Sequence, residues 1–338
     1  MAEHPAPHVT AIVPVLNDAE TLGDAVGSIL SQEYGGRLDV VIAVGPSADD
    51  SMAAATDLAK RHPEVRVIAN PPGGTAAGLN RAIQVAEGDV IARVDAHARL
   101  TPGYLQLAVR LLDALDADNV GGMQVAVGRS GSERAIALAM SSPFGSGDSR
   151  FRVGGEAGPV DSVYLGVFRR EALERVGGFD ESLVRNQDYE LNVRLRASGG
   201  LVYFDPRLRV EYLPRDGLRS IARQYFEYGV WKVVVLRRHP ASLRMRQVIP
   251  PMVVAANVLG VAVAFAGKRR ALLIPGLYLV GDLAASLLAG RQQPWSVRCR
   301  LPLTFATMHH SWGAGFLTAL CGIRGREESR SARVAGTL

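Results

Sequence analysis

Residues 88–97 read Gly-Asp-Val-Ile-Ala-Arg-Val-Asp-Ala-His, and this stretch decides the fold of the chain. Residues 89–94 are apolar and rich in β-branched side chains, which predicts a buried strand. Asp95 and His97 follow at the point where this strand ends. In open α/β sheets, ligands bind outside the carboxyl ends of the strands. The Asp-x-His pair can therefore offer one oxygen and one nitrogen to a divalent ion that also binds a diphosphate; the alternative is a solvated turn.

Strands and helices alternate on both sides of this stretch. The residues before it predict, in turn, a strand and a helix at 9–16, 21–32, 39–44, 51–61, 65–69 and 75–86. The residues after it predict helices at 102–117 and 170–176 and strands at 120–127, 160–168, 201–205 and 209–213. Because strands alternate with helices of ten or more residues, we expect an α/β fold with a mostly parallel sheet flanked by helices.

Residues 128–160 are rich in glycine and contain Arg150 and Arg152. A long glycine-rich stretch inside a compact domain is usually a functional lid or a disordered loop. We expect a mobile loop that closes over a substrate and offers one of these arginines to a phosphate.

A second group of polar residues follows a Gly-Gly turn at 177–178. Residues 185–194 read Arg-Asn-Gln-Asp-Tyr-Glu-Leu-Asn-Val-Arg, which predicts the start of a helix. Asp188 and Glu190 then lie in the first turn, where the helix dipole favours carboxylates. Capping explains one acid but not the whole cluster, so these residues are candidates for chemistry.

Composition divides the 338 residues into a part that resembles a soluble α/β enzyme and a far more apolar part at 248–323. Cys299 and Cys321 make no disulfide framework, which favours a reducing compartment for the soluble part. Both lie in the apolar part, so an equal alternative is that they are inert apolar side chains. The formal net charge is +5, and arginines cluster around 207–246, as expected beside an anionic membrane surface. No nucleic-acid-binding motif accompanies the charge, so nucleic acid is not an expected partner. The N-terminus lacks a signal sequence, so we expect the soluble part in the cytoplasm.

The apolar part predicts membrane association. Residues 216–237 combine basic and apolar side chains at helical spacing, which favours an interfacial helix over a core helix. Three apolar stretches of roughly the 20 residues that span a bilayer follow at 248–267, 271–290 and 301–323. Basic residues at 268–270 and in the tail at 324–338 favour two spans over three. The first or the third stretch is then the one that does not span.

Four motifs, taken in order, resemble those of the family 2 inverting glycosyltransferases. They are Val13–Asn17, Asp95–His97, Gly177–Glu181, and Gln187-Asp188 with Leu191 and Arg194. Longer strings at 186–192, 223–229 and 310–317 resemble a narrower branch, the membrane-associated glucosyltransferases of succinoglycan-type exopolysaccharide assembly. The resemblance implies a GT-A fold over 1–215, with an interfacial helix and linker at 216–247, membrane segments at 248–323 and a basic tail at 324–338. It also implies Mg²⁺ or Mn²⁺ as the cofactor.

The resemblance assigns roles residue by residue. Asp95 and His97 take the places of the family's metal-binding Asp-x-Asp, and Asp188 matches its catalytic base. Nucleotide-sugar binding would fall to Pro14, Val15, Asn17, Asp49, Asn80 and Asp95. The acceptor side would be shaped by Gly178, Phe179, Asp180 and Gln187, the last of which replaces a family glutamate.

This chain departs from the family at two points of the donor side. The second strand commonly ends in a pair of aspartates that help to read the base, and here Val44 and Gly45 stand there, with Asp49 further on. The expectation of a UDP-sugar over another nucleotide sugar therefore stays open. His97 is a softer ligand than Asp and could instead act as a donor behind the metal ligands.

The expected function is transfer of a single sugar with inversion, from a nucleotide-diphosphate sugar to a saccharide or a polyprenyl-phosphate-linked acceptor at the cytoplasmic membrane. The chain lacks the Gln-x-x-Arg-Trp string of processive synthases, which favours single transfer. Two alternatives remain: a nucleotidyltransferase, and a catalytically silent glycosyltransferase-like membrane subunit.

Overall fold

The computed structural model describes residues 6–214 and 217–322. Within them, nine strands form one mixed sheet: β1 (Val9–Val15), β2 (Leu38–Val44), β3 (Val65–Ala69), β4 (Val90–Arg93), β5 (Ala98–Leu100), β6 (Asn119–Ala126), β7 (Gly158–Pro159), β8 (Tyr164–Arg169) and β9 (Val202–Tyr212). Their order is β3-β2-β1-β4-β8-β6-β9-β5, with β7 paired to β9. Strands β3, β2, β1 and β4 are parallel, whereas β8 joins β4 and β6 in antiparallel register. The predicted α/β fold is confirmed.

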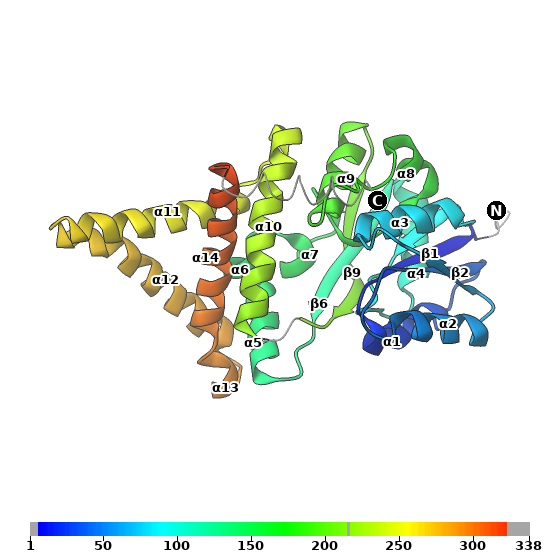
Figure 1. Ribbon diagram of the computed structural model, residues 1–338, viewed down its shortest axis with the longest axis horizontal. Helices are drawn as coiled ribbons and strands as arrows, with labels where there is room; N and C mark the ends of the chain where they lie inside the picture. Colours follow the sequence, from blue (N-terminus) through cyan, green and yellow to red (C-terminus); the bar gives the residue numbers. More distant parts are fainter. Residues whose placement is uncertain (1–5, 215–216, 323–338) are drawn as a thin grey trace. The chain divides into compact units, whose positions relative to one another are not determined.

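The helices that connect these strands cover both faces of the sheet. They are α1 (Ala19–Leu30), α2 (Ser51–Arg61), α3 (Thr75–Val85), α4 (Tyr104–Leu115), α8 (Arg170–Val176) and α9 (Gln187–Ala197). Figure 1 shows α1 and α2 on one side of β1 and β2, and α3 on the other. This follows from right-handed crossovers, because the chain moves outward from β1 to β3 and then returns across β1 to reach β4.

Parallel register brings three loops of this half-sheet to one edge. Val9 of β1 lies opposite Leu38 of β2 and Val90 of β4. The carboxyl ends of β1, β2 and β4 therefore point the same way, and Ile12 of β1 lies opposite Arg93, the last residue of β4. The candidate residues that follow each strand are gathered at this edge.

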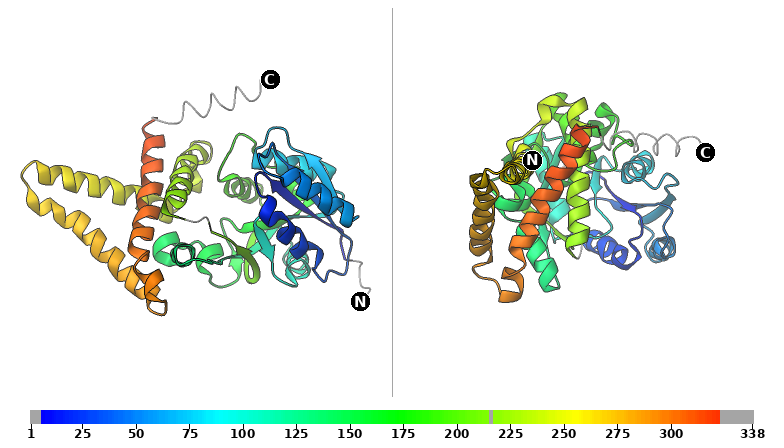
Figure 2. Two further views of the ribbon diagram at one scale, coloured as in Figure 1. Left: turned by 60° about the horizontal axis from the view of Figure 1, so that its bottom comes forward. Right: turned by 60° about the vertical axis from the view of Figure 1, so that its left-hand side comes forward.

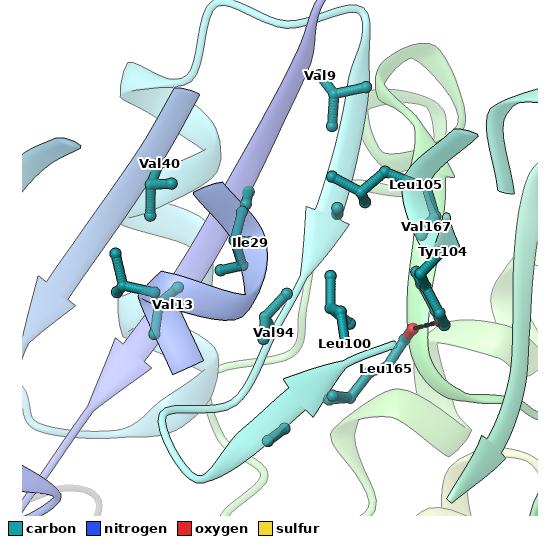
Figure 3. Packing of buried hydrophobic residues seen from close by; sticks show 14 of the residues in the cluster. Val9, Val13, Ile29, Val40, Val94, Leu100, Tyr104, Leu105, Leu165 and Val167 are labelled. Atoms are coloured by element: carbon teal, nitrogen blue, oxygen red, sulfur yellow. Dashed lines mark hydrogen bonds between the residues drawn. The ribbon is translucent and has the colours of Figure 1, made fainter. Parts of the chain in front are cut away.

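Apolar side chains from both the strands and the helices build the core next to it. Val13, Ile29 and Val40 have no exposed surface, and Figure 3 shows them converging from β1, α1 and β2. The hydroxyl of Tyr104 donates a hydrogen bond to the carbonyl of Leu165 at 3.2 Å. Because each buried aliphatic side chain contributes about 1.5–3 kcal/mol, this cluster holds the sheet and its helices together.

One stretch predicted as two short strands is a single strand. The structure places Pro206 inside β9, which continues from Val202 to Tyr212. Residues 203–204 pair with β7 and residues 210–212 pair with β5. Proline lacks a backbone N–H, and Pro206 lies between these two paired segments, so it breaks neither of them.

The chain folds into two compact units: Met1–Val125 with Gly154–Tyr212, and Ala126–Val153 with Leu213–Leu338. We call them the sheet unit and the helical unit. The domain boundaries expected from the sequence stay a prediction, and the basic tail at 324–338 lies outside the described residues.

The helical unit contains α5 (Gly131–Met140), α6 (Pro143–Ser146), α7 (Arg150–Val153), α10 (Leu218–Arg238), α11 (Met245–Phe265), α12 (Leu273–Gly290), α13 (Trp295–Arg298) and α14 (Leu301–Leu320), with short 3₁₀ turns at Pro240–Ser242 and Arg269–Leu272. Helices α10 and α14 cross closely, because a Cβ at Gly229 or Gly315 would lie 2.1 Å from a carbonyl oxygen of the other helix. Figure 2 shows α11 and α12 joined in a hairpin whose open end meets α14.

Two helices of the described residues are long and apolar enough to cross a membrane, by length and composition. They are Met245–Phe265, with a mean hydropathy of 2.1, and Arg269–Gly290, with 1.8. Both lie in the hairpin of Figure 2, and most of their surface is exposed. This pair agrees with membrane association and contains the first two of the three apolar stretches.

The glycine-rich stretch is not the predicted loop, since α5, α6 and α7 lie within it. Its glycines allow close packing: a Cβ at Gly145 would lie 2.1 Å from the carbonyl oxygen of Ala139. Arg152 donates a hydrogen bond to the hydroxyl of Tyr225 in α10 at 2.7 Å, within the same helical unit. Composition alone does not distinguish glycines that permit packing from glycines that permit motion.

Candidate active site

A buried arginine joins the two acids that the sequence singles out. Arg93 ends β4 with its side chain 4% exposed. Its Nε and Nη2 donate hydrogen bonds to Oδ1 of Asp95 at 3.1 and 2.9 Å. Its Nη1 donates to Oδ1 of Asp188, which lies 95 positions further along the chain. One guanidinium therefore holds both carboxylates at the carboxyl edge of the sheet.

Each carboxylate presents a second oxygen beside this contact. Among the described residues, Oδ2 of Asp95 and Oδ2 of Asp188 accept no hydrogen bond, and both contacts to Arg93 use Oδ1. The side chains are 18% and 33% exposed, so both oxygens are near solvent. Each acid therefore has one oxygen that is anchored and one that can bind a ligand or a proton.

Local backbone geometry places Asp188. It is the second residue of α9, where the helix dipole stabilises a carboxylate. Asn186, the residue directly before α9, has a φ of 63°, a left-handed conformation that Asn adopts more readily than most residues. This turn starts the helix so that Asp188 meets the end of β4.

Asp95 is held in its charged form. Burial tends to raise the pKa of Asp95, but the positive charge of Arg93, with further contributions from His97 and Arg185, outweighs it and lowers that pKa below its ordinary value. Asp95 is therefore a carboxylate at neutral pH, the form that binds cations.

The other predicted metal ligand has a different set of neighbours. Nδ1 of His97 lies 3.7 Å from Oδ1 of Asp18, and its ring meets the edge of Tyr212 at 5.6 Å between centroids. Within the described ranges no group of three or more His, Cys, Asp or Glu side chains could hold a metal. Mg²⁺ is often bound by one or two carboxylates together with substrate phosphates, and Asp95 fits that pattern.

The predicted donor-side residues lie in the loops after β1 and β2, which hydrogen bonds tie together. Asn17 has a φ of 57°, and its Oδ1 accepts a hydrogen bond from the backbone N–H of Ala48 at 2.7 Å. Asp49 accepts from the N–H of Ala19 at 3.0 Å and from the hydroxyl of Ser51 at 2.5 Å. Pro14 and Val15 end β1 directly before this pair of loops.

Asn80 lies elsewhere, against the predicted acceptor loop. Its Nδ2 donates to the carbonyl of Phe179 at 2.8 Å, and its Oδ1 accepts from the N–H of Phe179 at 2.8 Å. Gly178 has a φ of 72°, and a Cβ there would lie 2.7 Å from Oδ1 of Asn80. Arg194 of α9 donates to the carbonyl of Gly178 from the other side at 2.8 Å. The loop at 177–181 is thus held by both α3 and α9.

The remaining acceptor-side residues are close to this loop in the chain. Asp180 accepts hydrogen bonds from the N–H and hydroxyl of Ser182 at 3.0 and 2.6 Å. Gln187 is 8% exposed at the start of α9. The structure therefore places Phe179, Asp95 and Asp188 around Arg93, whose guanidinium lies 5.9 Å from the centroid of the Phe179 ring.

Sequence reasoning missed Arg93 as a member of the site. The available signal was its charge inside a strand that is otherwise apolar, because buried charges need partners. The partner Asp188 could not be identified, since the two residues meet only through the fold.

Comparison with known proteins identifies the family of the chain. Residues 10–177 match the family model Glycosyl transferase family 2. The chain is 30% identical over 324 residues to the succinoglycan biosynthesis protein ExoA of Rhizobium meliloti (strain 1021), covering 93% of this chain and 96% of that protein. It is 26% identical to the pre-mycofactocin glycosyltransferase of Mycobacterium tuberculosis (strain ATCC 25618 / H37Rv), covering 94% of this chain and 68% of that one.

A solved structure shares the fold. The mannosyltransferase PcManGT from Pyrobaculum calidifontis, in complex with GDP-Man and Mn2+, superposes with a TM-score of 0.61 at 20% identity, covering 93% of this chain and 87% of that one. Together with the nearly full-length relative, these similarities show that the chain is a glycosyltransferase with the GT-A fold and belongs to glycosyl transferase family 2.

Proposed function

We propose that this protein transfers a single sugar, with inversion, from a nucleotide-diphosphate sugar to a saccharide or a lipid-linked saccharide acceptor. The observation that carries the proposal is the meeting of Asp95 and Asp188 on Arg93 at the carboxyl edge of the sheet. In this proposal one acid binds the donor side and the other accepts a proton, which are the two tasks of a one-step displacement.

Asp188 is the proposed general base. Its anchored Oδ1 fixes the carboxylate, and Oδ2 accepts the proton of the acceptor hydroxyl as that oxygen attacks the anomeric carbon. The new bond joins the acceptor oxygen to this carbon while the bond to the diphosphate breaks. Because the oxygen attacks the face opposite the leaving diphosphate, the configuration inverts. A charged leaving group needs no acid catalyst, so a single carboxylate base suffices.

Asp95 is the proposed ligand of a divalent ion, Mg²⁺ or Mn²⁺, with His97 as a second donor near it. Such an ion, when bound, neutralises charge on the departing diphosphate. The neighbour PcManGT was solved with GDP-Man and Mn2+, which supports a nucleotide-sugar donor and a divalent ion here. Pro14, Val15, Asn17 and Asp49 are the proposed contacts to the nucleotide, and a UDP-sugar is the expected donor.

The proposed acceptor follows from the relatives and the apolar hairpin. ExoA is a succinoglycan biosynthesis protein, which supports a growing saccharide of the cell envelope or an exopolysaccharide as the acceptor. Helices α11 and α12 support attachment to the cytoplasmic membrane, where a polyprenyl-phosphate carrier would present the saccharide. The sheet unit is proposed to face the cytoplasm, where nucleotide sugars are made.

The proposal is tested by turnover and product stereochemistry. Asp188→Asn is expected to lower kcat by ~10²–10⁴ while leaving binding of the donor nucleotide within about twofold. The product of the wild-type enzyme is expected to carry the anomeric configuration opposite to that of the donor, as read by NMR. Asp113→Asn, which removes an exposed acid of the same unit, is the matched control. Retained configuration, or near-normal turnover of Asp188→Asn, would contradict the proposal.

A further inference from the structure

We infer that Arg93 is a positioning residue that sets the place of the catalytic base and the donor-binding acid relative to each other. This inference rests on the proposed function and deepens it. It starts from the guanidinium of Arg93, which is almost fully buried and contacts Asp95, Asp188 and the ring of Phe179.

The geometry uses the whole guanidinium. The edge formed by Nε and Nη2 faces Oδ1 of Asp95, and Nη1 at the opposite side faces Oδ1 of Asp188. The guanidinium carbon lies over the Phe179 ring, 5.9 Å from its centroid, and two hydrogen bonds with the side chain of Asn80 fix the backbone of Phe179. A rigid fork that fills all of these contacts permits little change in the separation of the two carboxylates.

Charge gives a second reason. Two carboxylates that converge on one place repel each other. The guanidinium of Arg93 lies between them and offsets this repulsion by attracting both. Both Oδ2 atoms are left clear of Arg93, so the residue aligns the acids without occupying the oxygens that act.

Substitution of Arg93 by lysine and by glutamine would remove different contributions of the guanidinium to holding the two carboxylates. Arg93→Lys keeps a positive charge, but a single ammonium group cannot hold two carboxylates at opposite edges. Arg93→Gln removes the charge as well. If Arg93 acts by positioning the two acids, the kcat of Arg93→Lys is expected to be little higher than that of Arg93→Gln.

The test is a double-mutant cycle on the full-length protein in detergent. In the wild-type background, Arg93→Gln is expected to lower kcat by ~10–100-fold, because residues that orient functional groups have effects of this size. In the Asp188→Asn background, where the base is already absent, Arg93→Gln is expected to lower kcat by no more than ~3-fold. Equal effects in the two backgrounds would overturn the inference.

Binding of the donor nucleotide with Mn²⁺ gives a readout besides activity. Arg93→Gln is expected to weaken it by ~10-fold through Asp95. Asp188→Asn is expected to leave it unchanged, and unchanged binding in Arg93→Gln would count against the inference. Near-normal turnover of Asp188→Asn would instead show that Asp188 is not the base. The role of Arg93 toward Asp95 would then be decided by nucleotide binding alone.

Thermal unfolding separates a positioning role from a structural one. Arg169→Gln is the matched control: that arginine is 25% exposed and donates to the backbone carbonyls of Leu112 and Ala117, away from both acids. It is expected to lower stability and leave kcat unchanged. If both Arg93 variants fail to fold while Asp95→Asn and Asp188→Asn fold, Arg93 belongs to the core and the inference is wrong.

Discussion

At the scale of single residues, the predicted acceptor loop at 177–181 is held by Asn80, whose amide the family resemblance assigns to the donor side instead. Asn80 pairs with both backbone groups of Phe179 and also donates to Oε1 of Glu181 at 2.9 Å. Gly178 can lie this close only because it has no Cβ. The position of the loop is therefore set by α3 as well as by its own turn.

Asn80→Ala is expected to loosen this loop. Loss of the hydrogen bonds to Phe179 should lower the free energy of unfolding by about 1–3 kcal/mol. If the loop shapes the acceptor side, the KM for the acceptor should rise by several-fold, while the KM for the donor changes little. Steady-state kinetics with each substrate varied in turn measures this. If only the KM for the donor rose, Asn80 would belong to the donor side, and the acceptor-side role of this loop would be contradicted.

At the scale of elements, the pairing of β1 with β4 requires a glycine before β4. A Cβ at Gly88 would lie 2.5 Å from the backbone nitrogen of Thr10 and 2.7 Å from the carbonyl oxygen of His8. Both of these are backbone atoms and cannot move independently. Gly88 therefore permits the close approach that puts Asp95 at the edge of the sheet.

Gly88→Ala is expected to destabilise the protein by about 1–3 kcal/mol, because the added methyl group pushes two strands apart. Gly23→Ala is the matched control, since a Cβ at Gly23 in α1 has no neighbour within 4 Å among the described residues. That change should stabilise the helix by roughly 0.5–1 kcal/mol. Denaturant unfolding measures both, and equal effects of the two substitutions would contradict this view of the β1–β4 contact.

The strand that continues through Pro206 has a charge pair at that point. Asp205 is 2% exposed and accepts hydrogen bonds from the side chain of Arg207 at 2.7 and 3.0 Å. These hydrogen bonds lower the pKa of Asp205 despite its burial. A carboxylate whose pKa is lower in the folded state adds stability above its unfolded pKa and loses it as the pH falls through the folded value.

Asp205→Asn is therefore expected to lower the free energy of unfolding at pH 7 by about 1 kcal/mol, since Arg207 is partly exposed to solvent. The difference from the wild type should shrink as the pH falls from about 4, the pKa of an aspartate in the unfolded chain, through the lower pKa of Asp205 in the folded protein. Denaturant unfolding at several pH values measures it. A difference that stays constant with pH would show that Arg207 does not act through the charge of Asp205.

At the scale of the whole molecule, the sequence predicted the regular half of the fold well. Helix 170–176 and strand 65–69 were predicted with the observed bounds, because Gly, Pro and apolar periodicity mark them locally. Local motifs mark the two candidate acids Asp95 and Asp188, but no local pattern marks Arg93, whose role depends on a contact with a residue 95 positions away. The continuation of β9 through Pro206 and the packing of Gly145 also depend on neighbours that no local pattern reveals.

The apolar hairpin gives a prediction at this scale. Val280 lies near the middle of α12 and is 63% exposed. Val280→Arg should weaken retention in washed membranes, because an arginine at the centre of a spanning helix costs about 2.5–3.5 kcal/mol on insertion scales. Met52→Arg, at a 44% exposed apolar position in α2, is the matched control and should not change retention. Equal retention of both variants would argue against insertion of α12.

The most direct test of the account is a calorimetric titration of the full-length protein in detergent with UDP, GDP and TDP, each with and without Mn²⁺. We expect micromolar binding of one nucleotide that requires Mn²⁺, is abolished by Asp95→Ala and persists in Asp188→Asn. This pattern would separate the donor-binding acid from the base. Absence of binding for all three nucleotides, or binding that survives Asp95→Ala, would contradict the proposed active site.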